Sequence, residues 1–172
     1  SPIIKELDRR QIKYKTVFTG QHKELYEDVQ DLIPKPDYNL NIMSHNQTLT
    51  QILSNISLKF GEILNIEKPN LLIVQGDTTT VAVCSLIAYY EGVMIGHVEA
   101  GLRTFNLKSP FPEEGNRQIV SRIADFNWAP TQLAANQLVK ENAQNIFITG
   151  NTVIDACNSY NYNIEYGDEV LI

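Results

Sequence analysis

The chain has 172 residues, 43% of them hydrophobic, and this size and composition suit one globular domain with a buried core. Its 14 Lys and Arg against 20 Asp and Glu give a formal net charge of -6, which disfavours a polyanion such as nucleic acid as a partner. No apolar run approaches the roughly 20 residues needed to span a bilayer, so we expect a soluble, cytoplasmic protein without a membrane partner.

Helical and extended patterns alternate from the first residues onward. Ser1-Pro2 is typical of a helix start, and because no strand precedes it, we expect the numbered chain to begin inside a βα unit. Residues 13–19 are strand-like and end at Gly20-Gln21-His22, after which residues 24–31 are polar. The apolar residues of 48–65 follow helical spacing and predict a long core helix.

The rest of the chain continues the same alternation. The predicted strands cover residues 71–74, 93–98, 126–129 and 146–149, with the start of one more at 169–172. The predicted helices cover residues 79–90, 118–124, 131–140 and 153–159. Cys84 and Cys157 lie in two of these helices without the spacing of a zinc site or a redox motif, and we interpret both as reduced packing residues.

This alternation predicts an α/β fold, an open parallel sheet with right-handed crossovers and helices on both faces. Ligands bind such sheets beyond the carboxyl ends of the strands. Polar clusters follow the predicted strands directly, at Gly20-Gln21-His22, at Gly76-Asp77, at residues 97–103 and at Gly150-Asn151. We therefore expect these clusters to meet at one edge of the sheet. The absence of a full G-x-G-x-x-G fingerprint and of a P-loop argues against a dinucleotide or nucleoside triphosphate held in the usual way.

Each cluster also has a purely structural interpretation. Asp77 and the three threonines after it can cap a helix, His97 can be a hydrogen-bonded core residue, and Glu113-Glu114 suits a helix start. Glu99 is harder to explain in this way, because it follows a buried strand and precedes a residue pair that allows a ligand or backbone to come close. The structural interpretations leave unexplained why acids and arginines gather at one sheet edge, which favours an active site for a charged substrate.

Four ordered motifs resemble those of the non-hydrolysing UDP-N-acetylglucosamine 2-epimerases. They are Gly-Asp-Thr-Thr-Thr at 76–80, His-Val-Glu-Ala-Gly-Leu-Arg-Thr at 97–104, Pro-Glu-Glu-Gly-Asn-Arg at 112–117 and Gly-Asn-Thr-Val-Ile-Asp at 150–155. The run at residues 20–22 also fits, and the similarity covers nearly the whole chain.

This resemblance implies the amino-terminal, Rossmann-like half of a two-domain glycosyltransferase-like (GT-B) fold. The domain is expected to cover residues 1–155 without its first strand, and 156–172 to form a linker and the start of a carboxyl-terminal domain. The family's Gly-Thr-Arg-Pro-Glu segment and the remainder of its second domain do not occur in the sequence. Because the site of such a protein lies between two domains, we expect the 172-residue chain alone to be inactive.

The resemblance implies a reaction in cell-surface polysaccharide biosynthesis, the interconversion of UDP-N-acetylglucosamine and UDP-N-acetylmannosamine. Carbon 2 of the sugar is weakly acidic and has no adjacent ketone, so elimination of UDP to a 2-acetamidoglucal, followed by re-addition, provides the route. One base, one acid across the ring and fixed positive charge or helix N-termini for the diphosphate are needed, whereas neither a metal nor another cofactor is.

The resemblance implies roles for the residues that match the family motifs. The candidate catalytic residues are Asp77, Glu99 and Glu113, and which of them is the base stays open. Arg103 and Arg117 suit diphosphate or carboxylate pairing through their bidentate geometry. The full candidate substrate-binding set is Gln21, His22, His97, Arg103, Glu114 and Arg117.

Other activities remain open at this stage. An epimerase for another UDP-acetamido sugar has the same first domain, and a GT-B glycosyltransferase has the same fold but needs one base toward an acceptor. A non-catalytic binding domain is the third alternative. The resemblance further implies a homodimer, with UDP-N-acetylglucosamine as substrate. Whether UDP-N-acetylglucosamine also acts as an allosteric activator, as in some bacterial relatives, stays open.

Overall fold

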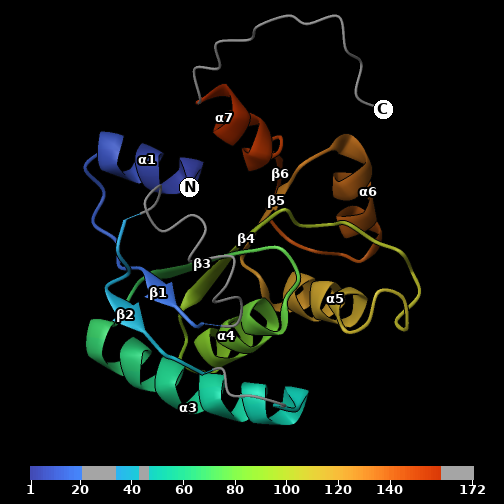
Figure 1. The fold of residues 1–172 in the computed structure, drawn as a ribbon. Helices are drawn as coiled ribbons and strands as arrows, with labels where there is room; N and C mark the ends of the chain where they lie inside the picture. The colour runs from blue at the N-terminus through green and yellow to red at the C-terminus, as the bar shows by residue number, and fades with distance from the viewer. Residues whose placement is uncertain (21–33, 43–46, 160–172) are drawn as a thin grey trace, which may run out of the picture. The chain divides into compact units, whose positions relative to one another are not determined.

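The computed structural model describes residues 1–20, 34–42 and 47–159, which form two compact units (Figure 1). Of the described residues, 1–13 and 151–159 form one unit, and 14–20, 34–42 and 47–150 form the other. Predictions for Gln21 and His22, for the polar segment 24–31 and for a strand at 169–172 lie outside the described residues.

The first unit pairs helix α1 (Pro2–Arg9) with helix α7 (Thr152–Asn158). Ser1 is the N-cap residue of α1 with Pro2 in the first turn, as predicted, although the Ser1 side chain makes no capping hydrogen bond. Asn151 caps α7, because its side-chain oxygen accepts a hydrogen bond from the backbone N–H of Val153 at 3.0 Å. The ammonium of Lys5 donates to the hydroxyl of Ser159 at 3.3 Å and links the two helices.

The second unit contains a parallel four-stranded sheet in the order β3-β4-β5-β6. Its strands are β3 (Leu71–Gln75), β4 (Met94–Val98), β5 (Phe126–Ala129) and β6 (Ile146–Ile148). A separate parallel pair joins β1 (Val17–Phe18) to β2 (Tyr38–Asn39). The predicted α/β fold with an open parallel sheet is confirmed, whereas the strand expected at 13–19 shortens to two residues and β2 was not predicted.

Helices α3 (Leu49–Glu67), α4 (Thr79–Tyr90), α5 (Glu113–Ile123) and α6 (Gln132–Lys140) belong to the same unit. Threonines begin three of them: Thr48 forms a capping box with Gln51, and the side chains of Thr78 and Thr131 accept from backbone N–H groups in the first turns of α4 and α6. Figure 1 shows α3 and α4 side by side beneath the sheet, and the two helices are in contact. Among the described residues, no helix is long and apolar enough to span a membrane.

The core of this unit has two parts. The larger part lies among α3, α4, α5 and the sheet, with Ile56, Ile95 and Val120 fully buried. The smaller part packs α6 against β5 and the chain after β4, through Ala100, Ala129, Ala134, Ala135 and Leu138. It anchors the loop that leaves β4, which matters for the site.

The two cysteines differ in environment. Both are free, but Cys84 is buried in α4 and Cys157 is exposed on α7. Burial raises the pKa of the Cys84 thiol to about 12, as expected of an inert packing residue. Cys157 is also reduced, as predicted, but its predicted packing role was wrong, because it is exposed and none of the α7 residues is buried.

Candidate active site

The carboxyl ends of β3 and β4 bring two of the predicted acids together. The strands pair with Val74 opposite His97 and Gln75 opposite Val98. The pairing continues one step further, because the N–H of Gly76 donates to the carbonyl of Val98 at 3.1 Å. The residues that come next after these two strands are Asp77 and Glu99, so both leave the sheet at the same edge, as the strand-end rule predicted.

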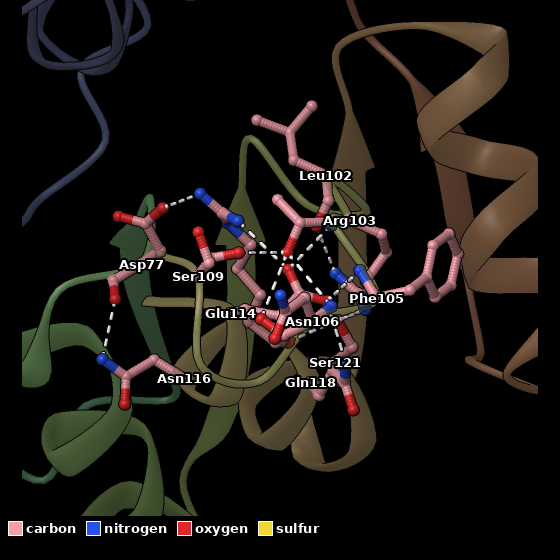
Figure 2. A network of polar contacts seen from close by, with 12 residues as sticks. Asp77, Leu102, Arg103, Phe105, Asn106, Ser109, Glu114, Asn116, Gln118 and Ser121 are labelled. Carbon is pink, nitrogen blue, oxygen red and sulfur yellow. Dashed lines mark hydrogen bonds and ion pairs between the residues drawn. The ribbon is translucent and has the colours of Figure 1, made fainter. Parts of the chain in front are cut away.

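Asp77 does not cap α4, although its sequence position allowed that role. Thr78 is the N-cap residue, and Asp77 instead faces α5 (Figure 2). The Asp77 carboxylate accepts a hydrogen bond from Arg117 Nη2 at 2.5 Å, and the backbone carbonyl of Asp77 accepts one from Asn116 Nδ2 at 2.8 Å. The Asp77 side chain keeps 28% of its surface exposed, so it is held in place yet accessible.

Glu114 is a fully buried carboxylate at the start of α5. Its oxygens accept from the backbone N–H groups of Thr104 at 3.0 Å and Phe105 at 3.2 Å, from Gln118 Nε2 at 2.9 Å and from Arg117 Nη1 at 3.1 Å (Figure 2). Burial acts to raise the pKa of Glu114, but these donors outweigh it and hold the pKa below its ordinary value. Arg117 therefore bridges the two carboxylates, Asp77 and Glu114.

Glu113 and Glu99, the other two predicted carboxylates, are half-buried. Glu113 is the first residue of α5, and since Arg117 follows one turn later, both lie on the same face of the helix. Glu99 has the left-handed backbone conformation, with φ of 66°, which a non-glycine residue adopts only where its surroundings enforce it. The three predicted carboxylates thus start from adjoining positions: the end of β3, the end of β4 and the first turn of α5.

His97 is buried within the sheet, and its ring serves the loop after β3. Its Nε2 lies 2.8 Å from the carbonyl oxygen of Gly76, while Nδ1 has no partner among the described residues. Burial lowers the pKa of His97, so the neutral ring donates from Nε2 to this carbonyl. The contact fixes the backbone next to Asp77, and substrate contact by His97 stays a prediction.

The guanidinium of Arg103 forms its hydrogen bonds with other residues of the chain. Its side chain has no exposed surface, and Nε and Nη2 donate to the two carboxylate oxygens of Glu141 at 2.8 and 2.7 Å. Nη2 also donates to the Ser121 hydroxyl at 2.7 Å, and Nη1 to the carbonyl of Leu102 at 2.8 Å. The structure thus separates the two predicted arginines, because Arg117 reaches Asp77 while Arg103 reaches the end of α6.

Sequence reasoning missed Asn116, Ser121 and Glu141. Asn116 lies inside the motif at 112–117, so its place beside two predicted site residues was an available signal. Ser121 and Glu141 carried none, because their roles come from contacts with Arg103, 18 and 38 residues away in the chain. Within the part of the chain that the structure describes, His, Cys, Asp and Glu do not gather in groups of three that could hold a metal ion.

The fold defines a Rossmann-like α/β domain, with carboxylates and an arginine at the carboxyl edge of its sheet. Residues 5–171 match the family model described as UDP-N-acetylglucosamine 2-epimerase, and the chain belongs to that family. The resemblance in the sequence motifs is thereby confirmed, as is the relation of the fold to the GT-B type.

Named relatives agree with this assignment. The UDP-N-acetylglucosamine 2-epimerase of Bacillus subtilis (strain 168) is 47% identical over 163 residues, covering 92% of this chain and 43% of that protein. The Campylobacter jejuni protein of the same name is 45% identical over 160 residues, covering 91% and 42%. The crystal structure of the Neisseria meningitidis enzyme bound to UDP-GlcNAc matches with a TM-score of 0.84 and 44% identity, over 90% of this chain and 44% of that one. The chain spans less than half the length of these relatives.

Proposed function

We propose that this chain is part of an epimerase that interconverts UDP-N-acetylglucosamine and UDP-N-acetylmannosamine. The observation that carries the proposal is the convergence of Asp77, Glu99 and the first turn of α5 at the carboxyl edge of the sheet, with Arg117 bound to Asp77. Membership of the epimerase family and the bound UDP-GlcNAc of the Neisseria relative support the same reaction.

In this proposal the carboxylates divide the proton transfers between them. One of Asp77, Glu99 and Glu113 removes the proton from carbon 2 as UDP leaves from carbon 1, and another delivers a proton to the opposite face of the glucal before UDP returns. Arg117 supports this chemistry by holding Asp77 in one orientation. No metal or redox group takes part.

The remaining candidate residues have supporting or substrate-facing roles. The buried side chains of His97 and Glu114 make their contacts inside the chain, which favours roles in fixing the loops after β3 and β4. Gln21 and His22 are proposed to contact the nucleotide sugar, since they follow β1 in a motif that fits the family.

Larger-scale properties belong to the same proposal. Residues 1–155 are proposed as the amino-terminal domain, and 156–172 as the passage to a second domain, because the relatives are more than twice as long as the matched region. The complete protein is proposed to be a cytoplasmic homodimer that acts in cell-surface polysaccharide synthesis and responds to UDP-N-acetylglucosamine as an activator. The 172-residue chain alone is expected to lack turnover.

The test uses the full-length protein with UDP-N-acetylglucosamine in heavy water, followed by proton NMR of the sugar. Deuterium at carbon 2 of a manno product is the expected result, and Asp77→Asn should abolish it. Glu91→Gln is the control, because Glu91 is an exposed residue that ends α4. Transfer of the sugar to an acceptor without isotope at carbon 2 would instead identify a glycosyltransferase and refute the proposal.

A further inference from the structure

The loop that follows β4, residues 99–105, is held from two sides, and we call it the Glu99 loop. At its start, the N–H of Ala100 donates to the carbonyl of Trp128 at 3.0 Å. Gly101 then lies directly on α6, where an added Cβ would be 2.3 Å from the carbonyl oxygen of Ala134. At its end, the N–H groups of Thr104 and Phe105 donate to the buried carboxylate of Glu114 on α5.

The pair Arg103–Glu141 ties the middle of this loop to the end of α6. Glu141 is the C-cap residue of α6, and both of its carboxylate oxygens receive a hydrogen bond from the Arg103 guanidinium. Arg122, on α5, donates to the backbone carbonyl of Glu141 and holds that residue from the other helix. The Arg103 hydrogen bond to Ser121 adds a second tie to α5 (Figure 2).

Arg103 has little capacity left for a substrate. Four of the five guanidinium N–H groups of an arginine are accounted for by Glu141, Ser121 and the carbonyl of Leu102. The side chain has no exposed surface, whereas Arg117 keeps 15% of its side-chain surface exposed. A bidentate pair fixes direction as well as distance, which suits a tether better than a point charge does.

The tether matters because of the backbone at Glu99. A non-glycine residue persists with φ of 66° only when contacts on either side enforce it. The contacts of Ala100, Gly101 and Arg103 supply that enforcement within four residues. Loss of the Arg103 tether releases the middle of the loop from the end of α6 and lets Glu99 relax away from the sheet edge.

We infer that Glu141 is a positioning residue for the reaction, acting through Arg103 to hold the catalytic carboxylate of Glu99 in place. This inference rests on the proposed function for its kinetic consequence, and it goes beyond the family motifs, none of which contains Glu141. Glu141 touches neither substrate nor reacting atoms in this account. Its effect therefore belongs in kcat and not in the binding of UDP.

The test compares full-length wild-type protein with Glu141→Gln, Arg103→Lys and the double variant Arg103→Met/Glu141→Leu. Glu141→Gln keeps the shape but turns one acceptor into a donor facing Arg103. The double variant removes both charges, which leaves no unpaired buried ion and protects folding. Glu91→Gln is the matched control, because Glu91 ends α4 as Glu141 ends α6 and its side chain has no partner among the described residues.

All three variants are expected to lose kcat by about 100-fold, as a misplacement near 1 Å does, with KM and calorimetric UDP affinity unchanged. Hydrogen exchange of the amides in the Glu99 loop, measured by mass spectrometry, should become faster in the same variants and stay unchanged in Glu91→Gln. The double variant distinguishes positioning of Glu99 from a general contribution of the pair to the stability of the fold. Because the double variant is expected to fold without the charged pair, full kcat in it would overturn the inference.

Two other results would also overturn it. Weaker UDP binding with unchanged kcat in Arg103→Lys would make Arg103 a substrate contact. Unchanged exchange in the Glu99 loop of Glu141→Gln would mean that the pair does not hold the loop. The exchange measurement does not depend on turnover, so it tests the tether even if the wild-type protein proves not to be an epimerase, a failure that the wild-type assay detects by itself.

Discussion

Replacing Gly101 by alanine tests whether the Glu99 loop is as tightly packed on α6 as its geometry indicates. Gly101 has φ of +89°, a conformation that side-chain-bearing residues rarely adopt. An alanine Cβ would lie 2.3 Å from the carbonyl oxygen and 2.8 Å from the carbonyl carbon of Ala134, and 2.9 Å from Leu138 Cγ. Two of these three atoms are helix backbone, which has little freedom to move aside.

The cost has two parts. The left-handed conformation costs an alanine about 1 to 2 kcal/mol relative to glycine. Overpacking against α6 adds about 1 to 3 kcal/mol, because the loop or the helix must shift to relieve the overlap. The free energy of unfolding should therefore fall by roughly 2 to 5 kcal/mol, a large part of the total stability of an ordinary domain.

Urea unfolding of the 172-residue chain, followed through Trp128, its one tryptophan, measures this difference. With an m value of about 2 kcal/mol/M, the midpoint should fall by about 1 to 2.5 M. Gly115→Ala is the control, because a Cβ there meets nothing within 4 Å and alanine in a helix is expected to gain up to about 1 kcal/mol. Equal midpoints for wild type and Gly101→Ala would refute the packing argument.

Three further predictions concern the charged groups of the site. Arg117→Met should lower the free energy of unfolding by about 3 to 5 kcal/mol, because it leaves the buried carboxylate of Glu114 without its cation; denaturant midpoints measure it. The pKa of Glu114 is lowered in the folded state, so its contribution to stability is fully present above the unfolded value of 4.5 and is lost as pH falls through the folded value. The stability advantage of wild type over Glu114→Gln should therefore shrink in acid. The pKa of His97 is also lowered, so wild type should lose stability as pH falls below 6.5, and His97→Gln should lack that part of the pH dependence.

Each of these has an outcome that contradicts it. A cost well under 1 kcal/mol for Arg117→Met would mean that Glu114 is stabilised by its N–H donors alone. A stability difference between wild type and Glu114→Gln that does not change with pH would show that Glu114 titrates alike in both states. Identical pH profiles for wild type and His97→Gln would mean that the ring is protonated as easily in the fold as outside it.

The elements that the sequence predicted well are those with local signals. Helix α4 was predicted at 79–90 and observed there, because a threonine cap opens it and Gly92 follows its end. Strand β2 escaped prediction, because its two residues are extended only through pairing with β1, some 20 residues earlier, and carry no periodicity of their own. The structural interpretation of Glu113-Glu114 as a helix start is confirmed, because α5 begins at Glu113, although its N-cap, Pro112, makes no side-chain capping bond.

For the site too, the sequence predicted some features and not others. That Asp77 and Glu99 share an edge followed from the rule for parallel strands, and the register of β3 and β4 confirms it. What each side chain contacts there did not follow, as Arg103 and Arg117 demonstrate. Both arginines lie in family-like motifs and had the same prediction, yet one is buried against α6 and the other bridges two carboxylates.

The difference between these arginines is one of partner, and the partner is chosen by the packing of helices. Arg117 finds Asp77 because α5 packs beside α4, whose first turn follows Asp77. Arg103 finds Glu141 because the small residues of the second core bring α6 against the loop at Gly101, where anything larger than hydrogen would keep the helix away. In the sequence motif, Gly101 allows a ligand to come close. In the fold, Gly101 instead allows α6 to pack against the loop, and this packing lets Glu141, which lies outside every motif, reach Arg103.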